Sequence, residues 1–88
     1  MPAERAPNPT SVLAEIRAFV ANWFRDGKEE GLEPETPLVT SGIVDSAGVV
    51  EVVEFLERRF LVKITDADLS LRNCNTLRGL SDLVVSRL

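Results

Sequence analysis

The sequence predicts an all-α fold, and three observations support this prediction. Apolar residues recur at helical spacing in three separate segments. No segment alternates apolar and polar residues over a length that would form a useful strand. Glycine and proline gather in the stretch between the first two helical segments, residues 28–44. We therefore expect a four-helix bundle of three main helices and one short helix, with a long first loop.

The N-terminal residues 1–9 are expected to form a flexible tail, because they contain three prolines and little apolar surface. The folded domain is then residues 10–88. Its first helix is expected to begin near Thr10 and to stop at Asp26-Gly27. The apolar repeat of this helix consists of Val12, Ile16, Phe19, Val20 and Trp23, with Leu13 beside it.

The stretch 28–44 has the composition of a structured loop whose apolar residues enter the core. Those residues are Leu32, Leu38, Val39, Ile43 and Val44. A second helix is expected from Ser46 to about Phe60. Its expected core stripe consists of Val49, Val53, Leu56 and Phe60, with Val50 and Val52 at the edges.

The opposite side of the second helix, which we name the docking face, carries a small residue, two carboxylates and an arginine. Its members are Ala47, Glu51, Glu54 and Arg58. An acidic helical face is ordinarily just solvated. Beside a tethered group it would also serve as the surface on which partner enzymes bind.

The remaining chain is expected to complete the bundle. Ile64 enters the core, and residues 65–69 form a short helix capped by Thr65 or Asp66. The final helix starts near Asn75-Thr76. Its apolar positions are Leu77, Leu80, Leu83, Val84 and Leu88.

The composition restricts the partners. The 88 residues suit one small domain with a single core, and 14 acidic against 10 basic residues give a net charge of -4. This charge argues against nucleic acid and anionic membranes as partners. No apolar run approaches the roughly 18 residues of a membrane span, and the N-terminus lacks the features of a signal peptide. We expect a cytoplasmic monomer without a membrane span.

The sequence gives little support for a catalytic site or a metal site. The chain has no histidine, so a serine nucleophile would lack its usual base, and we expect no catalytic residue. Cys74 is the single cysteine and is expected to be an ordinary buried side chain rather than a reactive thiol. A calcium loop starting at Asp66 would need glycine and glutamate where Leu71 and Leu77 stand, so we expect no metal site.

The pair Asp45-Ser46 is the most informative feature. Asp45 is a preferred N-cap, and the second helix begins directly after it. A phosphodiester on Ser46 would lie at the positive end of this helix, next to unpaired N–H groups. The pair could equally do no more than start a helix. The residues that surround the pair distinguish an attachment site from a plain helix start.

A longer series of residues resembles the acyl carrier protein family. It runs through Gly42-Ile43-Val44-Asp45-Ser46, Val50-Glu51-Val52-Val53, Leu56-Glu57, Phe60, Ile64, Asp66, Asp68 and Asn75-Thr76-Leu77. The resemblance covers roughly residues 11–88 and needs no gap between Asp45 and Asp68.

The resemblance implies a carrier whose serine, here Ser46, is esterified by a 4′-phosphopantetheine arm that a separate phosphopantetheinyl transferase takes from coenzyme A. It implies that Asp45 helps to bind the metal ion in the transferase complex and that the second helix is the recognition helix. The arm would hold acyl or aminoacyl cargo as a thioester. Further expected partners are an acyl- or aminoacyl-loading ligase and processing enzymes such as ketosynthases or acyltransferases.

Two departures from the family pattern indicate a specialised partner set. Ala47 stands where the family commonly has leucine, and Arg58-Arg59 interrupt the acidic helix. The form of the series is similar to stand-alone carriers of amino-acid or secondary-metabolite pathways, including D-alanyl carriers. From the positions of Met1 and Leu88 we expect a discrete carrier for lipid, polyketide, nonribosomal peptide or other secondary-metabolite biosynthesis. The alternative is a small helical interaction module that uses the docking face without an arm.

Overall fold

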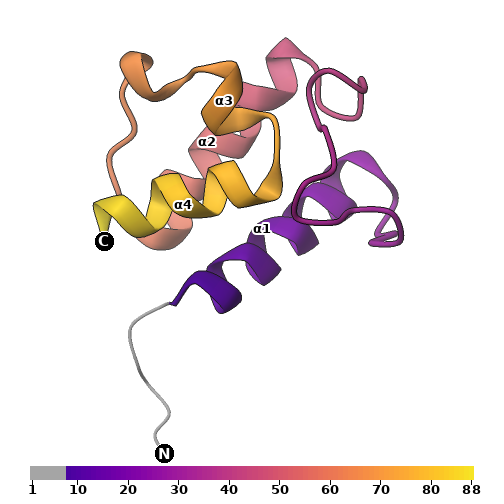
Figure 1. Cartoon of the computed structure of the whole chain (residues 1–88), viewed down its shortest axis with the longest axis horizontal. Coiled ribbons are helices and arrows are strands. Elements are labelled where there is room, and N and C mark those ends of the chain that lie inside the picture. The colour runs from indigo at the N-terminus through magenta and orange to yellow at the C-terminus, as the bar shows by residue number, and fades with distance from the viewer. Residues whose placement is uncertain (1–7) are drawn as a thin grey trace, which may run out of the picture.

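The computed structural model describes residues 8–88, and these form an all-α bundle (Figure 1). The three longer helices are α1 (Pro9–Phe24), α2 (Ser46–Phe60) and α4 (Leu77–Arg87). Between α2 and α4 lie a single turn of 3-10 helix, η1 (Asp66–Asp68), and the short helix α3 (Leu71–Cys74). The predicted all-α class is confirmed. Within the described residues, no helix is long and apolar enough to cross a membrane.

Helix α1 begins one residue earlier than the sequence predicted. Asn8 is its N-cap, accepting from the Ser11 N–H at 2.9 Å, while the Ser11 hydroxyl accepts from the Asn8 N–H at 3.1 Å. Pro9 occupies the first turn, where its missing N–H costs nothing and its fixed φ suits a helix. Pro9 therefore lies in the helix, and Asn8 is its cap. Residues 1–7 of the predicted tail lie outside the described part.

The end of α1 and the long loop follow the prediction closely. Asp26 and Gly27 have positive φ, and the Gly27 N–H donates to the Ala21 carbonyl at 2.8 Å, which closes the last turn. The loop has no helix or strand of its own. It is held to the core by the buried side chains of Leu32, Leu38 and Val44, whereas Val39 and Ile43 are only partly buried.

Helix α2 has the predicted bounds, but its buried stripe is rotated from the predicted one. The buried positions are Gly48, Val52, Leu56 and Phe60. Val49 and Val53 are half-buried, and Val50 is exposed. The cause is that α1 packs along the Gly48 side of α2, while the Val49 side faces α3, which is too short to cover it.

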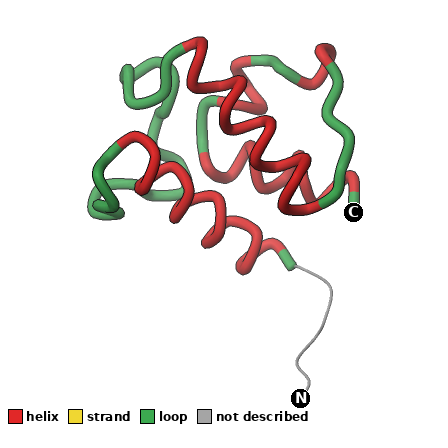
Figure 2. The backbone as a smooth tube through the Cα atoms, turned by 180° about the vertical axis from the view of Figure 1, so that it is seen from behind, coloured by secondary structure: helices red, strands yellow, loops and turns green. Residues whose placement is uncertain are grey.

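The core lies between the three longer helices, and α1 packs chiefly against α4 (Figures 1 and 2). It also takes in residues from the loop and from the segment after α2. Its members are Val12, Ile16, Val20, Ala21, Leu32, Leu38, Val44, Val52, Leu56, Phe60, Val62, Ile64, Cys74, Leu77, Leu80, Leu83 and Val84. Trp23, predicted as part of the apolar repeat of α1, is instead 58% exposed, and Leu88 is exposed beyond the end of α4.

The segment between α2 and α4 departs most from the prediction. The expected short helix near residues 65–69 is the turn η1, preceded by Thr65 as its N-cap. Helix α3 was not predicted; Ser70 caps it, accepting from the Asn73 N–H at 3.2 Å. A Cβ on Gly79 would lie 2.8 Å from the carbonyl oxygens of Arg72 and Asn73, so glycine lets α4 approach the backbone of α3.

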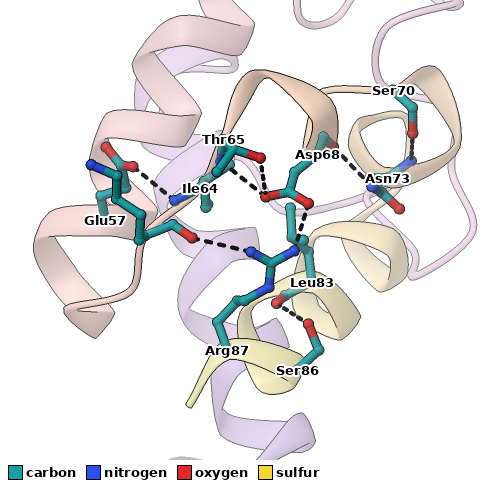
Figure 3. A network of polar contacts seen from close by, with 10 residues as sticks. Glu57, Ile64, Thr65, Asp68, Ser70, Asn73, Leu83, Ser86 and Arg87 are labelled. Atoms are coloured by element: carbon teal, nitrogen blue, oxygen red, sulfur yellow. Dashed lines mark hydrogen bonds and ion pairs between the residues drawn. The ribbon is translucent and has the colours of Figure 1, made fainter.

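Polar contacts hold this segment in place, as Figure 3 shows. The Asp68 carboxylate accepts from the Thr65 N–H at 2.9 Å and from Arg87 Nη2 at 2.5 Å. The Arg87 hydrogen bond, followed by that from the Thr65 backbone, lowers the pKa of Asp68 from 3.8 to about 2. At the other end, the Glu57 carboxylate accepts from the Ile64 N–H at 2.9 Å. The contact between Asp68 and Arg87 ties the end of α4 to η1.

Candidate functional site

Ser46 is the first residue of α2, and its side chain is exposed. Asp45 is the N-cap: its Oδ1 accepts from the Gly48 N–H at 2.7 Å, and its carbonyl accepts from the Val49 N–H at 2.9 Å. The N–H groups of Ser46 and Ala47 have no helical carbonyl before them, as in the first turn of any α-helix. The predicted cap is confirmed, and a hydroxyl stands at the positive end of a 15-residue helix.

The loop before Ser46 is fixed by Asn75, a residue that the sequence marked only as part of a resemblance and a helix start. Its Oδ1 accepts from the Val39 N–H at 2.8 Å and from the Thr40 N–H at 3.0 Å. Its backbone carbonyl accepts from the Leu38 N–H at 2.6 Å. Asn75, which lies between α3 and α4, therefore holds the part of the loop that leads to Ser46. This role depends on contacts between distant residues, which no local pattern reveals.

Two glycines shape the approach to α2. Gly42 has a φ of +87° and open space around it, so it provides a turn that other residues adopt with strain. Gly48 is buried, and a Cβ there would lie 2.7 Å from the Phe24 ring. The end of α1 thus packs directly against the first turn of α2, two residues from Ser46.

The docking face is exposed at all four predicted positions: Ala47, Glu51, Glu54 and Arg58. The charged neighbours Glu57 and Arg59 are engaged within the fold. Glu57 binds the Ile64 N–H, and Arg59 forms two contacts with Glu15 on α1, Nε to Oε1 at 2.6 Å and Nη2 to Oε2 at 2.9 Å. The charged side chains of α2 left to contact a partner are therefore Glu51, Glu54 and Arg58, two carboxylates and one guanidinium.

An open cavity of about 150 Å³ lies on the other side of α2, where Val49 faces α3. Its lining residues are Val39, Val49, Leu69, Ser70, Leu71 and Cys74. Burial, with a smaller contribution from the charge of Asp68, raises the pKa of the Cys74 thiol, which favours the unreactive protonated form. Cys74 is accordingly a buried wall of this cavity.

A larger hollow of about 290 Å³ lies elsewhere, between the start of α1 and α4. Its lining includes Pro9, Leu13, Pro34, Arg78 and Asp82, none of which belongs to the Ser46 turn. We therefore take the smaller cavity, which begins one turn after Ser46 on α2, as the one relevant to the site.

Comparison with known proteins identifies the family. Residues 14–84 match the family described as "Phosphopantetheine attachment site". The chain is also similar to the probable acyl carrier protein PigG of Serratia sp. (strain ATCC 39006), with 35% identity over 65 residues that cover 74% of this chain and 75% of the relative. The matched residues include Ser46, the whole of α2 and Asn75. The chain therefore belongs to the acyl carrier protein family, whose cofactor is a covalent 4′-phosphopantetheine.

Proposed function

We propose that Ser46 is the residue that receives the 4′-phosphopantetheine arm and that the chain carries acyl or aminoacyl intermediates between enzymes. The observation that supports this most is the exposed Ser46 hydroxyl on the first turn of α2, directly after the capping Asp45. Among the described residues, the Ser46 hydroxyl has no hydrogen-bond partner that would occupy it.

The surroundings of Ser46 suit the negative charge of a phosphodiester. The N–H groups of Ser46 and Ala47 and the dipole of α2 favour an anion at this end of the helix. Asp45 uses Oδ1 to cap Gly48, which leaves Oδ2 for a metal ion in the transferase complex. We therefore assign Asp45 two roles: it sets the geometry of the helix start, and it contacts the transferase-bound metal.

The arm would supply a terminal thiol that holds cargo as a thioester. The chain itself contributes position rather than catalysis. No histidine exists to activate Ser46, so the transferase must supply the base that removes the proton of its hydroxyl. We infer that the chain is a non-enzymatic carrier that works in the cytoplasm, where coenzyme A is available.

The cavity beside α2 favours a small cargo. Its volume of about 150 Å³ is comparable to that of cavities that hold one benzene ring. Short acyl chains or a single-ring acyl or aminoacyl group would fit against Val49, Leu71 and Cys74. A long fatty chain would project into solvent. We therefore favour an amino-acid or secondary-metabolite pathway over fatty acid synthesis.

We propose the docking face as the surface that partner enzymes recognise. Its exposed carboxylates Glu51 and Glu54 suit basic patches on a transferase, a loading ligase and processing enzymes such as ketosynthases or acyltransferases. Ala47 leaves room next to Ser46 for an approaching active site. Arg58, one turn beyond Glu54, would discriminate against partners that are basic along the whole helix.

The test of Ser46 is modification by a broad-specificity phosphopantetheinyl transferase with coenzyme A. Intact mass spectrometry should show the addition of one phosphopantetheine to the wild-type chain and none to Ser46→Ala. Ser86→Ala is a matched control, because Ser86 is exposed on another helix, and it should be modified as the wild type is. Absence of modification by several transferases would refute the proposal and favour a module that binds partners without an arm.

A further inference from the structure

An exposed tryptophan lies on the α1 side of the docking face. Trp23 is 58% exposed and stacks on Phe19, with ring centroids 5.6 Å apart. Phe19 in turn stacks on Phe55 of α2 at 4.2 Å. These three rings, which we name the aromatic row, cross the seam between the two helices and end in solvent at Trp23.

The contacts along the seam fix how α1 and α2 are aligned. Glu15 pairs with Arg59 at one end, Phe19 stacks on Phe55 in the middle, and Phe24 meets Gly48 at the other end. The two helices are therefore antiparallel. From the first contact to the second, four residues forward on α1 correspond to four backward on α2, and from the second to the third, five correspond to seven.

This alignment places Trp23 between the levels of Phe55 and Gly48 on α2, the part of the helix that includes Glu51. Trp23 is one turn beyond Phe19 on α1, and Glu51 is one turn before Phe55 on α2. Glu51 lies about 7.5 Å along the helix axis from Ser46, at 1.5 Å per residue. Trp23 therefore belongs to the same surface as the docking face and is close enough to Ser46 to be covered by an enzyme that reaches it.

The fold gives little reason for a tryptophan at this position. The seam is already filled by Phe19 and Phe55 and closed by Phe24 against Gly48. More than half of the Trp23 side chain contacts water, so it adds a stacking contact but little burial. Tryptophan is, in contrast, among the residues most enriched at the centres of protein interfaces.

We propose that Trp23 is the apolar anchor of the docking face and contacts the enzymes that act on Ser46. The fitting partner surface presents an apolar recess for the indole, flanked by lysine or arginine that pairs with Glu51 and Glu54. Among the four members of the docking face, Ala47 offers only one methyl group, so Trp23 and Phe55 supply the apolar area. Because any enzyme acting on Ser46 must cover the start of α2, this surface is continuous with the proposed modification site.

A second copy of the chain fits this surface less well. A symmetric dimer through Trp23 would bring two sets of Glu51 and Glu54 together, and each chain already carries a net charge of -4. A basic partner enzyme with an apolar recess would cover the Trp23 ring and would also pair with the Glu51 and Glu54 carboxylates. This inference rests on the proposed carrier function.

The first experiment uses the fact that Trp23 is the single tryptophan. The chain is labelled with 5-fluorotryptophan, and its one ¹⁹F resonance is followed as unlabelled broad-specificity phosphopantetheinyl transferase is added. We expect the resonance to shift or broaden and its solvent-isotope shift to fall. An unchanged resonance with the enzyme in excess over the chain and at a concentration well above the KM of modification would overturn the inference. A change that depends on the concentration of the chain alone would indicate a dimer and would also overturn it.

The second experiment measures the kinetics of modification. Trp23→Ala should raise the KM for the chain at least tenfold with kcat within twofold, and Trp23→Phe should restore most of the affinity. Leu88→Ala is the matched control, because Leu88 is a similarly exposed apolar residue, 55% exposed, directly after α4. Circular dichroism would confirm that each variant is folded.

The outcomes separate this inference from the carrier function. If the wild-type chain is not modified, the carrier function itself fails. If the wild-type and Trp23→Ala chains are modified with equal KM, Ser46 stands as the attachment residue and the role of Trp23 is refuted.

Discussion

Two regions of the bundle are held together by different forces. The region of α1 and α4 is joined by fully buried apolar side chains such as Ile16, Leu80 and Val84. The segment 61–76 buries only Val62, Ile64 and Cys74, and it is also held by hydrogen bonds and one ion pair through Glu57, Asp68 and Arg87 (Figure 3). The two kinds of contact have different roles. Apolar burial sets the stability of the domain, and polar contacts position the loop and the cavity next to Ser46.

The largest effect should come from the apolar region. Leu56 is fully buried on α2, so Leu56→Ala should lower the free energy of unfolding by about 2 to 5 kcal/mol. Val53, which the sequence placed in the core, is only half-buried, and Val53→Ala should cost about 1 kcal/mol. Chemical denaturation measures both values. Equal losses would mean that the rotated core stripe of α2 is incorrect.

A smaller loss of stability is expected from Asn75, together with a functional effect. Asn75→Ala removes two hydrogen bonds from the loop backbone, together with contacts to the Thr40 hydroxyl, and should lower the free energy of unfolding by about 1 to 3 kcal/mol. Because the loop then holds Ser46 less firmly, transferase modification should slow several-fold while α-helical circular dichroism persists. Asn22→Ala, at an exposed position of α1, is the control. Modification at the wild-type rate would show that the site does not depend on this anchor.

The smallest effect concerns the ion pair and depends on pH. The pKa of Asp68 is lowered from 3.8 to about 2, so its charged form stabilises the folded chain above the ordinary pKa. Wild type should be more stable than Asp68→Asn at neutral pH. The difference should shrink as the pH falls below about 4 and should be lost as the pH passes below about 2. Thermal denaturation across this range is the measurement, and Arg87→Gln should reproduce the profile. A difference of the same size at neutral pH and at pH 2 would contradict the assignment.

The parts of the fold that follow a local rule were predictable. The second helix was predicted at its observed bounds because Asp45 caps it and its apolar repeat ends at Phe60. The core positions of α4 followed from spacing alone. Helix α3 could not be found this way, because four residues contain no period and the helix depends on the Ser70 cap and on the close approach at Gly79.

The candidate site also has residues that follow a local rule and residues that depend on contacts between distant parts of the chain. Ser46, Asp45 and the exposure of the docking face could be predicted because all lie on one helix and its cap. Trp23 and Asn75 could not be assigned, because their positions depend on the packing of α1 on α2 and on hydrogen bonds between residues 36 apart. The core stripe of α2 was mispredicted for the same reason: it depends on which neighbouring helix is long enough to cover it.

The hydrogen bonds of Asn75 also have a consequence for the order of events during biosynthesis. Protein chains are synthesised from the N-terminus, so Ser46 is made before Asn75. The loop that leads to Ser46 reaches its observed conformation only after Asn75 binds Val39 and Thr40. A transferase that recognises this geometry would select chains that have completed folding, and unfinished chains would remain without coenzyme A-derived arms.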